Sequence, residues 1–293
     1  MTTRLVKAAD GRAIAVESWG DPEGAPVFLL HGTSGSRLGQ APRGAVLNWL
    51  GIHLITFDRP GYGDSDRRQG RRIADGAADV ASVADDLGLS RFAVVGRSGG
   101  APHALACAAL LPDRVTRAAT LVSLAPRDAS GLDWYAGMAE SNVRAYTSAD
   151  EYGSSGIAAT LRVRSRDIQA DPGRLIADLR RELTDSDRRV VADPMIRRML
   201  ALNFREALRQ DAGGWIDDAL AFGHRWGFDP ADIGCPVLLW HGQDDTFSPV
   251  EHSRWLADRI PDAWMMVEPG AAHFGALKIL PTVLRWAAQP GAG

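Results

Sequence analysis

The stretch FAVVGRSGGAPHAL, residues 92–105, carries the strongest structural signal in the chain. Its first four residues are apolar, as in a short strand that is covered on both faces. From Pro102 onward, small and apolar residues follow in a helical pattern. Between them, Gly96-Arg97-Ser98-Gly99-Gly100 matches G-x-S-x-G, a sharp strand-to-helix turn that exposes a serine at a strained backbone position. The alternative interpretation is an ordinary Gly–Ser loop.

The segments on either side of this stretch alternate between strand and helix signals, which is typical of a largely parallel sheet. The predicted strands are residues 4–8, 13–19, 26–31, 53–58, 92–96, 115–124, 236–240 and 263–267, the first two forming a hairpin. Helical patterns occur at residues 45–50, 73–87, 102–111 and 251–260, and again beyond His273. The sequence therefore predicts an α/β fold with a mostly parallel, eight-stranded sheet flanked by helices.

Residues 127–229 contain no buried-strand signal. Amphipathic helical patterns, broken by Gly, Pro and Ser, are clearest at residues 132–146, 173–183, 188–208 and 215–226. A helical block between two stretches of strand–helix alternation is typical of a lid over a site. We predict a core formed by residues 1–126 and 230–293, with residues 127–229 inserted after the sixth strand as a helical cap.

The composition is that of an ordinary globular protein and argues against several functions. Of 293 residues, 45% are hydrophobic and 24% are charged, so a large core needs no disulfide or metal. The net charge of −3, with acidic and basic residues interleaved, argues against a nucleic-acid partner. No run approaches the length of a membrane span, and the first residues do not resemble a secretory signal. We expect a cytoplasmic protein that acts on a small molecule, and the sequence leaves its oligomeric state open.

Neither a metal nor another cofactor is expected. Cys107 and Cys235 lie in apolar runs, where buried, inert thiols are expected. No H-x-x-x-H or C-x-x-C spacing occurs in the sequence. The G-x-G at Gly61 and Gly63 lacks the third glycine of a dinucleotide-binding loop, because Asp66 stands in its place.

A serine hydroxyl is a poor nucleophile at neutral pH, so Ser98 needs a base and the base needs an orienting acid. The loop after the strand at residues 236–240 contains Asp244 and Asp245, and the loop after the last strand contains His273. Each loop follows the carboxyl end of a predicted strand, where open α/β sheets place their sites. The order Ser, Asp, His along the chain is that of one known arrangement of the catalytic triad.

Together these motifs resemble the α/β-hydrolase superfamily over nearly the whole predicted core. The family pattern of Gly, two residues, Asp, three residues, Pro matches Gly242, Asp245 and Pro249, which makes Asp245 the expected acid, with Asp244 as the alternative. The segment at residues 58–65 is similar to the loop after the family's fourth strand. The segment at residues 31–33 resembles the family's oxyanion loop. The resemblance therefore implies that the main-chain N–H groups of Thr33 and Gly99 bind the oxyanion.

The resemblance implies a serine hydrolase that cleaves an ester or related carbonyl compound of a small, largely apolar molecule, without a cofactor. Family members that open epoxides or remove halogens from haloalkanes use an aspartate at the nucleophile position, so Ser98 argues against those reactions. Carbon–carbon bond hydrolysis, haloperoxidase-like perhydrolysis, iminopeptidase activity and lyase activity all use the same triad and stay open. A ligand-binding protein that retains the fold without turnover is an alternative of a different class.

The predicted cap is rich in aromatic residues, which often line small-molecule pockets. We expect Trp134 and Tyr135 of the cap, and Phe274 beside His273, to contact substrate; the alternative is that the cap aromatics form the cap's own core. Arg97 is expected to pair with a surface carboxylate, although it could instead contact an acidic group of the substrate.

Overall fold

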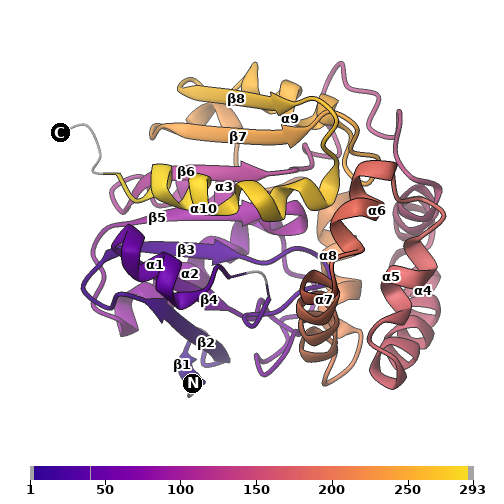
Figure 1. The fold of residues 1–293 in the computed structure, drawn as a ribbon, viewed down its shortest axis with the longest axis horizontal. Helices are drawn as coiled ribbons and strands as arrows, with labels where there is room; N and C mark the ends of the chain where they lie inside the picture. The colour runs from indigo at the N-terminus through magenta and orange to yellow at the C-terminus, as the bar shows by residue number, and fades with distance from the viewer. Residues whose placement is uncertain (1–2, 40, 290–293) are drawn as a thin grey trace.

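A computed structural model of the protein describes residues 3–39 and 41–289 and contains one mixed sheet of eight strands (Figure 1). The strand order is β1-β2-β4-β3-β5-β6-β7-β8. Strand β2 is antiparallel to both of its neighbours, and the other strands run parallel. The strands are β1 (Arg4–Lys7), β2 (Ala13–Gly20), β3 (Ala25–Leu30), β4 (Ile52–Phe57), β5 (Phe92–Arg97), β6 (Val115–Leu121), β7 (Val237–Gly242) and β8 (Ala263–Glu268). This is the predicted eight-stranded, mostly parallel sheet.

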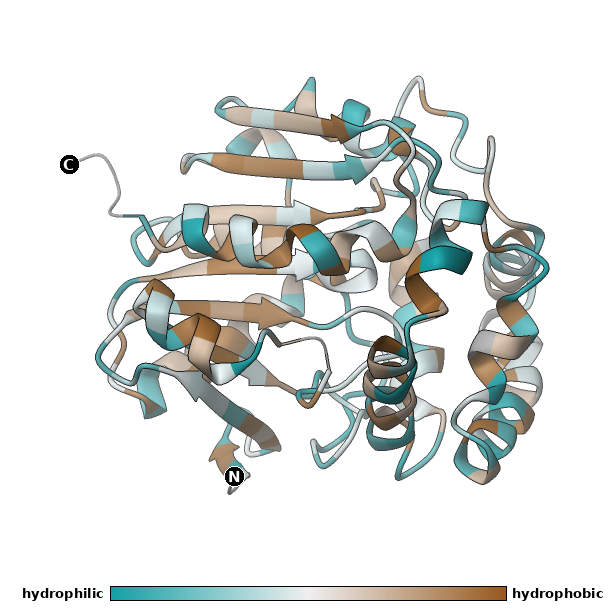
Figure 2. Cartoon of the chain, viewed as in Figure 1, coloured by the Kyte–Doolittle hydropathy of each residue, from teal (hydrophilic) through white to brown (hydrophobic). Residues whose placement is uncertain are grey.

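Helices cover both faces of the sheet, and the alternation of strand residues explains the two hydrophobic layers. In β3, Val27 and Leu29 face α1 (Gly44–Leu50) and α10 (Ala276–Ala287). Phe28 and Leu30 point to the other face, which is covered by α2 (Gly76–Asp86), α3 (Ala101–Leu110) and α9 (Val250–Ala257). Apolar strands buried between helical layers are visible in Figure 2. Both faces of the central strands are therefore buried, which confirms the prediction that the apolar runs form strands covered on both faces.

Five α-helices are inserted between β6 and β7, at the end of the sheet where the parallel strands finish (Figure 1). They are α4 (Glu140–Ala170), α5 (Arg174–Leu179), α6 (Asp185–Val191), α7 (Pro194–Ala207) and α8 (Gly213–Gly223). We call these five helices the cap. The helical insertion after the sixth strand is as predicted; a division into domains at residues 126/127 and 229/230 remains a prediction.

The helix bounds within the cap differ from the predicted ones for local reasons. The first cap helix begins at Glu140 rather than at residue 132 and runs to Ala170, with non-helical backbone at Gly153. The predicted helix at residues 188–208 is two helices, because Pro194 lacks an N–H group and starts a new one. The Asp193 side chain caps this second helix, accepting hydrogen bonds from the next main-chain amides.

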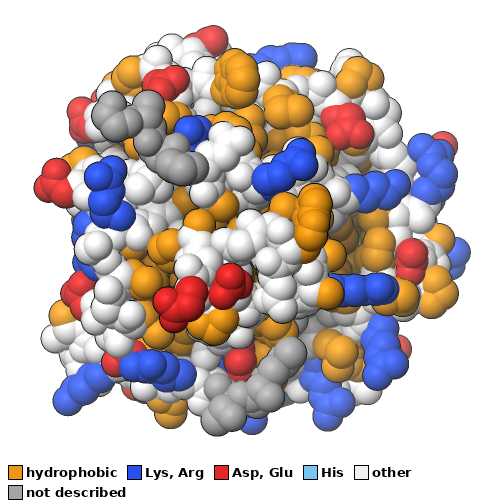
Figure 3. All heavy atoms as spheres, turned by 60° about the vertical axis from the view of Figure 1, so that its left-hand side comes forward, with side chains coloured by type: hydrophobic (Ala, Val, Ile, Leu, Met, Phe, Trp, Pro, Cys, Tyr) orange, Lys and Arg blue, Asp and Glu red, His pale blue; other side chains and the backbone are white. Residues whose placement is uncertain are grey.

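Charged side chains of both signs are interspersed on the face shown in Figure 3. Such a mixed face differs from the basic stripe that is typical of nucleic-acid-binding surfaces. Within residues 3–39 and 41–289, the structure contains no helix that is both long and apolar enough to cross a membrane.

Candidate active site

Ser98 lies at the turn between β5 and α3 with a φ angle of +51°, a region that residues with a side chain rarely adopt. The turn requires glycine two residues before and two residues after Ser98. A Cβ atom on Gly96 would lie 2.4 Å from the carbonyl oxygen of Gly100, and one on Gly100 would lie 2.3 Å from that of Leu30. The strained backbone therefore holds the Ser98 side chain at the carboxyl edge of the sheet.

The structure brings Asp245 and His273 together. His273 Nδ1 lies 2.8 Å from Asp245 Oδ2, while Asp245 Oδ1 accepts hydrogen bonds from the amides of Phe247 at 2.8 Å and Ser248 at 3.1 Å. Asp244, the alternative acid, is exposed to solvent. Of the two neighbouring aspartates, only Asp245 contacts the histidine.

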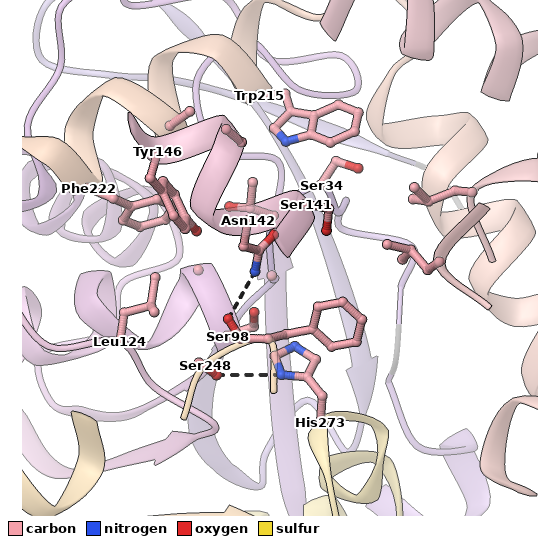
Figure 4. Close-up of a pocket in the computed structure, with 18 of the residues that line it drawn as sticks. Ser34, Ser98, Leu124, Ser141, Asn142, Tyr146, Trp215, Phe222, Ser248 and His273 are labelled. Carbon is pink, nitrogen blue, oxygen red and sulfur yellow. Dashed lines mark hydrogen bonds between the residues drawn. The ribbon is translucent and has the colours of Figure 1, made fainter. Parts of the chain in front are cut away.

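The Asp245 carboxyl group is held in its ionised form. Burial alone would raise its pKa, but the charge of His273 and hydrogen bonds from His273 and His241 lower the pKa below its usual range. A carboxylate at this position accepts a hydrogen bond from Nδ1–H of His273, which leaves Nε2 as the nitrogen that can act as a base. Ser98 and His273 line the same cavity (Figure 4).

Thr33 and Gly99, the predicted oxyanion residues, are neighbours in the structure. A Cβ atom on Gly99 would lie 2.3 Å from Thr33 Oγ1, and one on Gly32 would lie 3.3 Å from the Cβ atom of Ser98. The loop that follows β3 therefore packs directly against the turn that carries Ser98. Glycine at position 99 is required here because any side chain would overlap that of Thr33.

Between the turn at Ser98 and the cap lies a cavity of about 140 Å³. A cavity of about this size can hold a benzene molecule, so the space suits a small organic group. Figure 4 shows Tyr146, Trp215 and Phe222 of the cap on one side of it and Ser98 with His273 on the other. The remaining wall is mostly apolar and includes Leu124, Ile157, Leu161, Leu175, Leu179, Leu200, Phe204, Phe247 and Phe274.

Of the three predicted substrate contacts, only Phe274 lines this cavity. Trp134 is buried in the hydrophobic core, where its Nε1 donates to the carbonyl of Ala125 at 2.9 Å. The guanidinium carbon of Arg127 lies over the ring of Tyr135, 4.3 Å from the ring centroid. These two side chains pack between the cap and the core and do not line this cavity, where we expected them. Composition alone could not separate them from Tyr146, Trp215 and Phe222.

Arg97 is buried beside Ser98, and none of the carboxylates in the described part of the chain lies at ion-pair distance from it. Only 5% of it is exposed, and its Nη2 donates a hydrogen bond to the carbonyl of His273 at 3.4 Å. Burial lowers the pKa of the guanidinium to about 10, so it is still charged at neutral pH. Arg97 is thus buried rather than paired at the surface as expected, and it supports the loop that contains His273.

Several polar residues of the site carried no signal in the sequence. The Ser248 hydroxyl lies 3.2 Å from Asp245 Oδ2 and 3.5 Å from His273 Nδ1. Asp187 and Asp218 of the cap are both buried and contact the loops that contain His273 and Thr33. Among residues 3–39 and 41–289, no three His, Cys, Asp or Glu side chains are grouped as metal ligands.

A sequence model described as the alpha/beta hydrolase fold matches residues 25–278, and the chain therefore belongs to the α/β-hydrolase fold family. Epoxide hydrolase B of Mycobacterium tuberculosis (strain ATCC 25618 / H37Rv) is 34% identical over 115 residues. These residues cover 38% of this chain and 32% of that protein, so the chain spans well under two thirds of this curated relative.

Solved structures resemble the whole chain. The enol-lactonase from Burkholderia xenovorans LB400 superposes with a TM-score of 0.71 at 19% identity, covering 97% of each chain. An esterase from Rhodococcus sp. ECU1013 superposes with a TM-score of 0.69 at 20% identity, covering 100% of each chain. At these identities the likeness is one of fold.

Proposed function

We propose that this α/β-hydrolase is a serine hydrolase that cleaves an ester or related carbonyl compound of a small, largely apolar molecule through an acyl-enzyme. The observation that carries the proposal is the hydrogen bond between Asp245 and His273 at the wall of a cavity that Ser98 also lines. The mostly apolar wall supports a substrate of the same character. Ser98 in the nucleophile position favours acyl transfer over epoxide opening.

In the proposed reaction, Nε2 of His273 removes the proton of Ser98 as Oγ bonds to the substrate carbonyl carbon. The carbonyl electron pair moves to oxygen, and the main-chain N–H groups of Thr33 and Gly99 stabilise the resulting oxyanion. Asp245 stabilises the imidazolium. The oxyanion collapses, the bond to the leaving oxygen breaks, and His273 protonates that oxygen. Water, activated by the same imidazole, then releases the acid and restores Ser98.

The test compares the parent with Ser98→Ala in p-nitrophenyl acetate turnover and in fluorophosphonate labelling. We expect Ser98→Ala to lose more than about 10³-fold in kcat and to escape labelling. Ser154→Ala, which removes a hydroxyl from an exposed cap position, is the matched control and should keep both. A Ser98→Ala variant with the parent's rate would overturn the proposal. Labelling without repeated turnover would instead indicate a ligand-binding protein.

A further inference from the structure

One face of α8 contacts both residues that we assign to the oxyanion hole. Asp218 and Phe222 are four residues apart and so lie one turn apart on the same side of the helix. Asp218 Oδ2 accepts a hydrogen bond of 2.5 Å from the hydroxyl of Thr33. A Cβ atom on Gly99 would lie 3.0 Å from the end of the Phe222 ring. A helix of the cap thus packs against both Thr33 and Gly99.

Asp218 is a fully buried carboxylate with several donors. Its Oδ2 also accepts from Arg59 at 2.6 Å and Tyr62 at 2.7 Å, and its Oδ1 lies 2.6 Å from Nη2 of Arg71. Burial opposes ionisation, yet the guanidinium groups of Arg59 and Arg71 hold the pKa of Asp218 well below its usual range. The carboxylate is therefore a permanent, rigidly held acceptor for the Thr33 hydroxyl.

The same carboxylate fixes the start of the loop through Arg59. The Arg59 guanidinium donates to the carbonyl of His31, and the Arg59 amide donates to His31 Nε2 at 3.1 Å. Residues 31–33 are consequently held at two points, directly at Thr33 and through Arg59 at His31. With two guanidinium groups around one carboxylate, the cluster keeps a net positive charge next to the loop, which favours a developing oxyanion.

We propose that Asp218 is a positioning residue of the oxyanion hole and that α8 is a structural part of that hole. The inference rests on the proposed function, because it assumes that the amides of Thr33 and Gly99 bind the oxyanion. Oxyanion donors lower the barrier only when they are already aimed at the developing charge, so no reorganisation is needed during the reaction. The bond from Thr33 to Asp218 supplies this orientation.

The test uses both ends of the hydrogen bond. Thr33→Val removes the hydroxyl and keeps the shape, Thr33→Ser keeps the hydroxyl, and Asp218→Asn removes the charge. We expect Thr33→Val to lower kcat for p-nitrophenyl acetate by about 10- to 100-fold, with KM changed by less than about threefold. A trifluoromethyl ketone, which forms a tetrahedral adduct, should bind more weakly by a similar factor. Thr33→Ser should lose much less than Thr33→Val, a rescue that a purely structural role would not produce.

The matched control is Asp217→Asn. Asp217 precedes Asp218 on α8. It connects this helix to the core by accepting two hydrogen bonds from Arg67, at 2.8 and 2.9 Å, and it does not contact the loop at Thr33. Its variant should keep kcat within about twofold, whereas Asp218→Asn, which keeps an acceptor oxygen but loses the charge, should lose more kcat than Asp217→Asn and no more than Thr33→Val. The double variant of Thr33 and Asp218 should be no slower than the slower single variant.

Removing the charge of Asp218 leaves two buried guanidinium groups unpaired, so Asp218→Asn could fail to fold. In that case the Thr33→Val variant is the decisive test, because Asp218 then keeps its hydrogen bonds from Arg59 and Tyr62 and its ion pair with Arg71. A Thr33→Val variant with the parent's kcat and inhibitor affinity would overturn the inference, provided that Ser98→Ala is inactive. Retention of the rate by Ser98→Ala would instead overturn the proposed function.

Discussion

The main-chain amide of Phe274 donates a hydrogen bond of 2.8 Å to Oδ1 of Asp187, which connects the cap to the turn that contains His273. Thr184 caps the first turn of α6 and so holds Asp187 in place. Burial raises the pKa of Asp187, and the neighbouring His273 and the Phe274 amide offset part of that rise. A buried carboxylate of the cap thus supports the loop of the proposed base.

Asp187→Ala should lower kcat by about tenfold or more, because a hydrogen bond to a charged group contributes about 1.5–3 kcal/mol. Asp187→Asn keeps an oxygen that can accept from Phe274 and should lie between Asp187→Ala and the parent. Asp185→Ala, at an exposed position of the same helix, is the control. Steady-state kinetics with p-nitrophenyl acetate measures all three. Equal rates for Asp187→Ala and Asp185→Ala would contradict the expected support of the loop.

Replacing the two neighbouring aspartates separates the proposed acid from its alternative. Asp245→Asn should lower kcat by about 10⁴-fold, because a neutral amide no longer selects the tautomer of His273 in which Nε2 accepts a proton. Asp244→Asn should leave kcat near that of the parent, since Asp244 is exposed. Turnover of p-nitrophenyl acetate by the two variants, together with their thermal unfolding, tests this. A greater loss in the Asp244 variant would reverse the assignment.

The sheet and the turn at Ser98 were predictable because their causes are local. A short apolar run indicates a buried strand, and the glycines at positions 96 and 100 allow a sharp turn beside it. The structure has the strand, turn and helix that this pattern predicts. The position of His273 and Asp245 in loops after successive strands was also readable, because parallel strands finish at one edge of the sheet.

The polar contacts between cap and core were not predictable, because they join distant parts of the chain. Thr33 and Asp218 are 185 residues apart, and nothing beside either residue indicates the other. The same limit applies to the aromatic residues of the cap. Trp134 and Trp215 both lie in segments with a helical pattern, yet of the two only Trp215 lines the cavity. Which aromatic side chain reaches the cavity depends on how the helices pack.

Enlarging the cavity should change the preference for acyl length. Leu161→Ala removes a buried side chain from the cavity wall and leaves space for additional methylene groups of the substrate. Each methylene that the enlarged cavity buries contributes about 0.8 kcal/mol, so the kcat/KM ratio of p-nitrophenyl hexanoate to acetate should rise about fourfold per methylene. Val163→Ala, on the same helix and 56% exposed, should keep the parent's ratio. Unchanged ratios in both variants would show that the acyl group lies elsewhere.

Acid should destabilise the protein through His252. A main-chain N–H can only donate, so Nδ1 of His252 accepts from Ala125 at 3.0 Å and its Nε2 donates to the carbonyl of Trp134 at 3.1 Å. Burial lowers the pKa of His252 to about 4, against about 6.5 in the unfolded chain. The unfolded state therefore binds more protons between these values, and stability present above pH 6.5 is lost as the pH falls towards 4.

Urea unfolding at pH 7.5 and 4.5 should show a contribution of about 2–3 kcal/mol from this residue. His252→Asn keeps an acceptor for Ala125, so it should lose less free energy of unfolding between the two pH values, although it is less stable than the parent at pH 7.5. Equal losses in variant and parent would mean that His252 is not the source of the acid sensitivity.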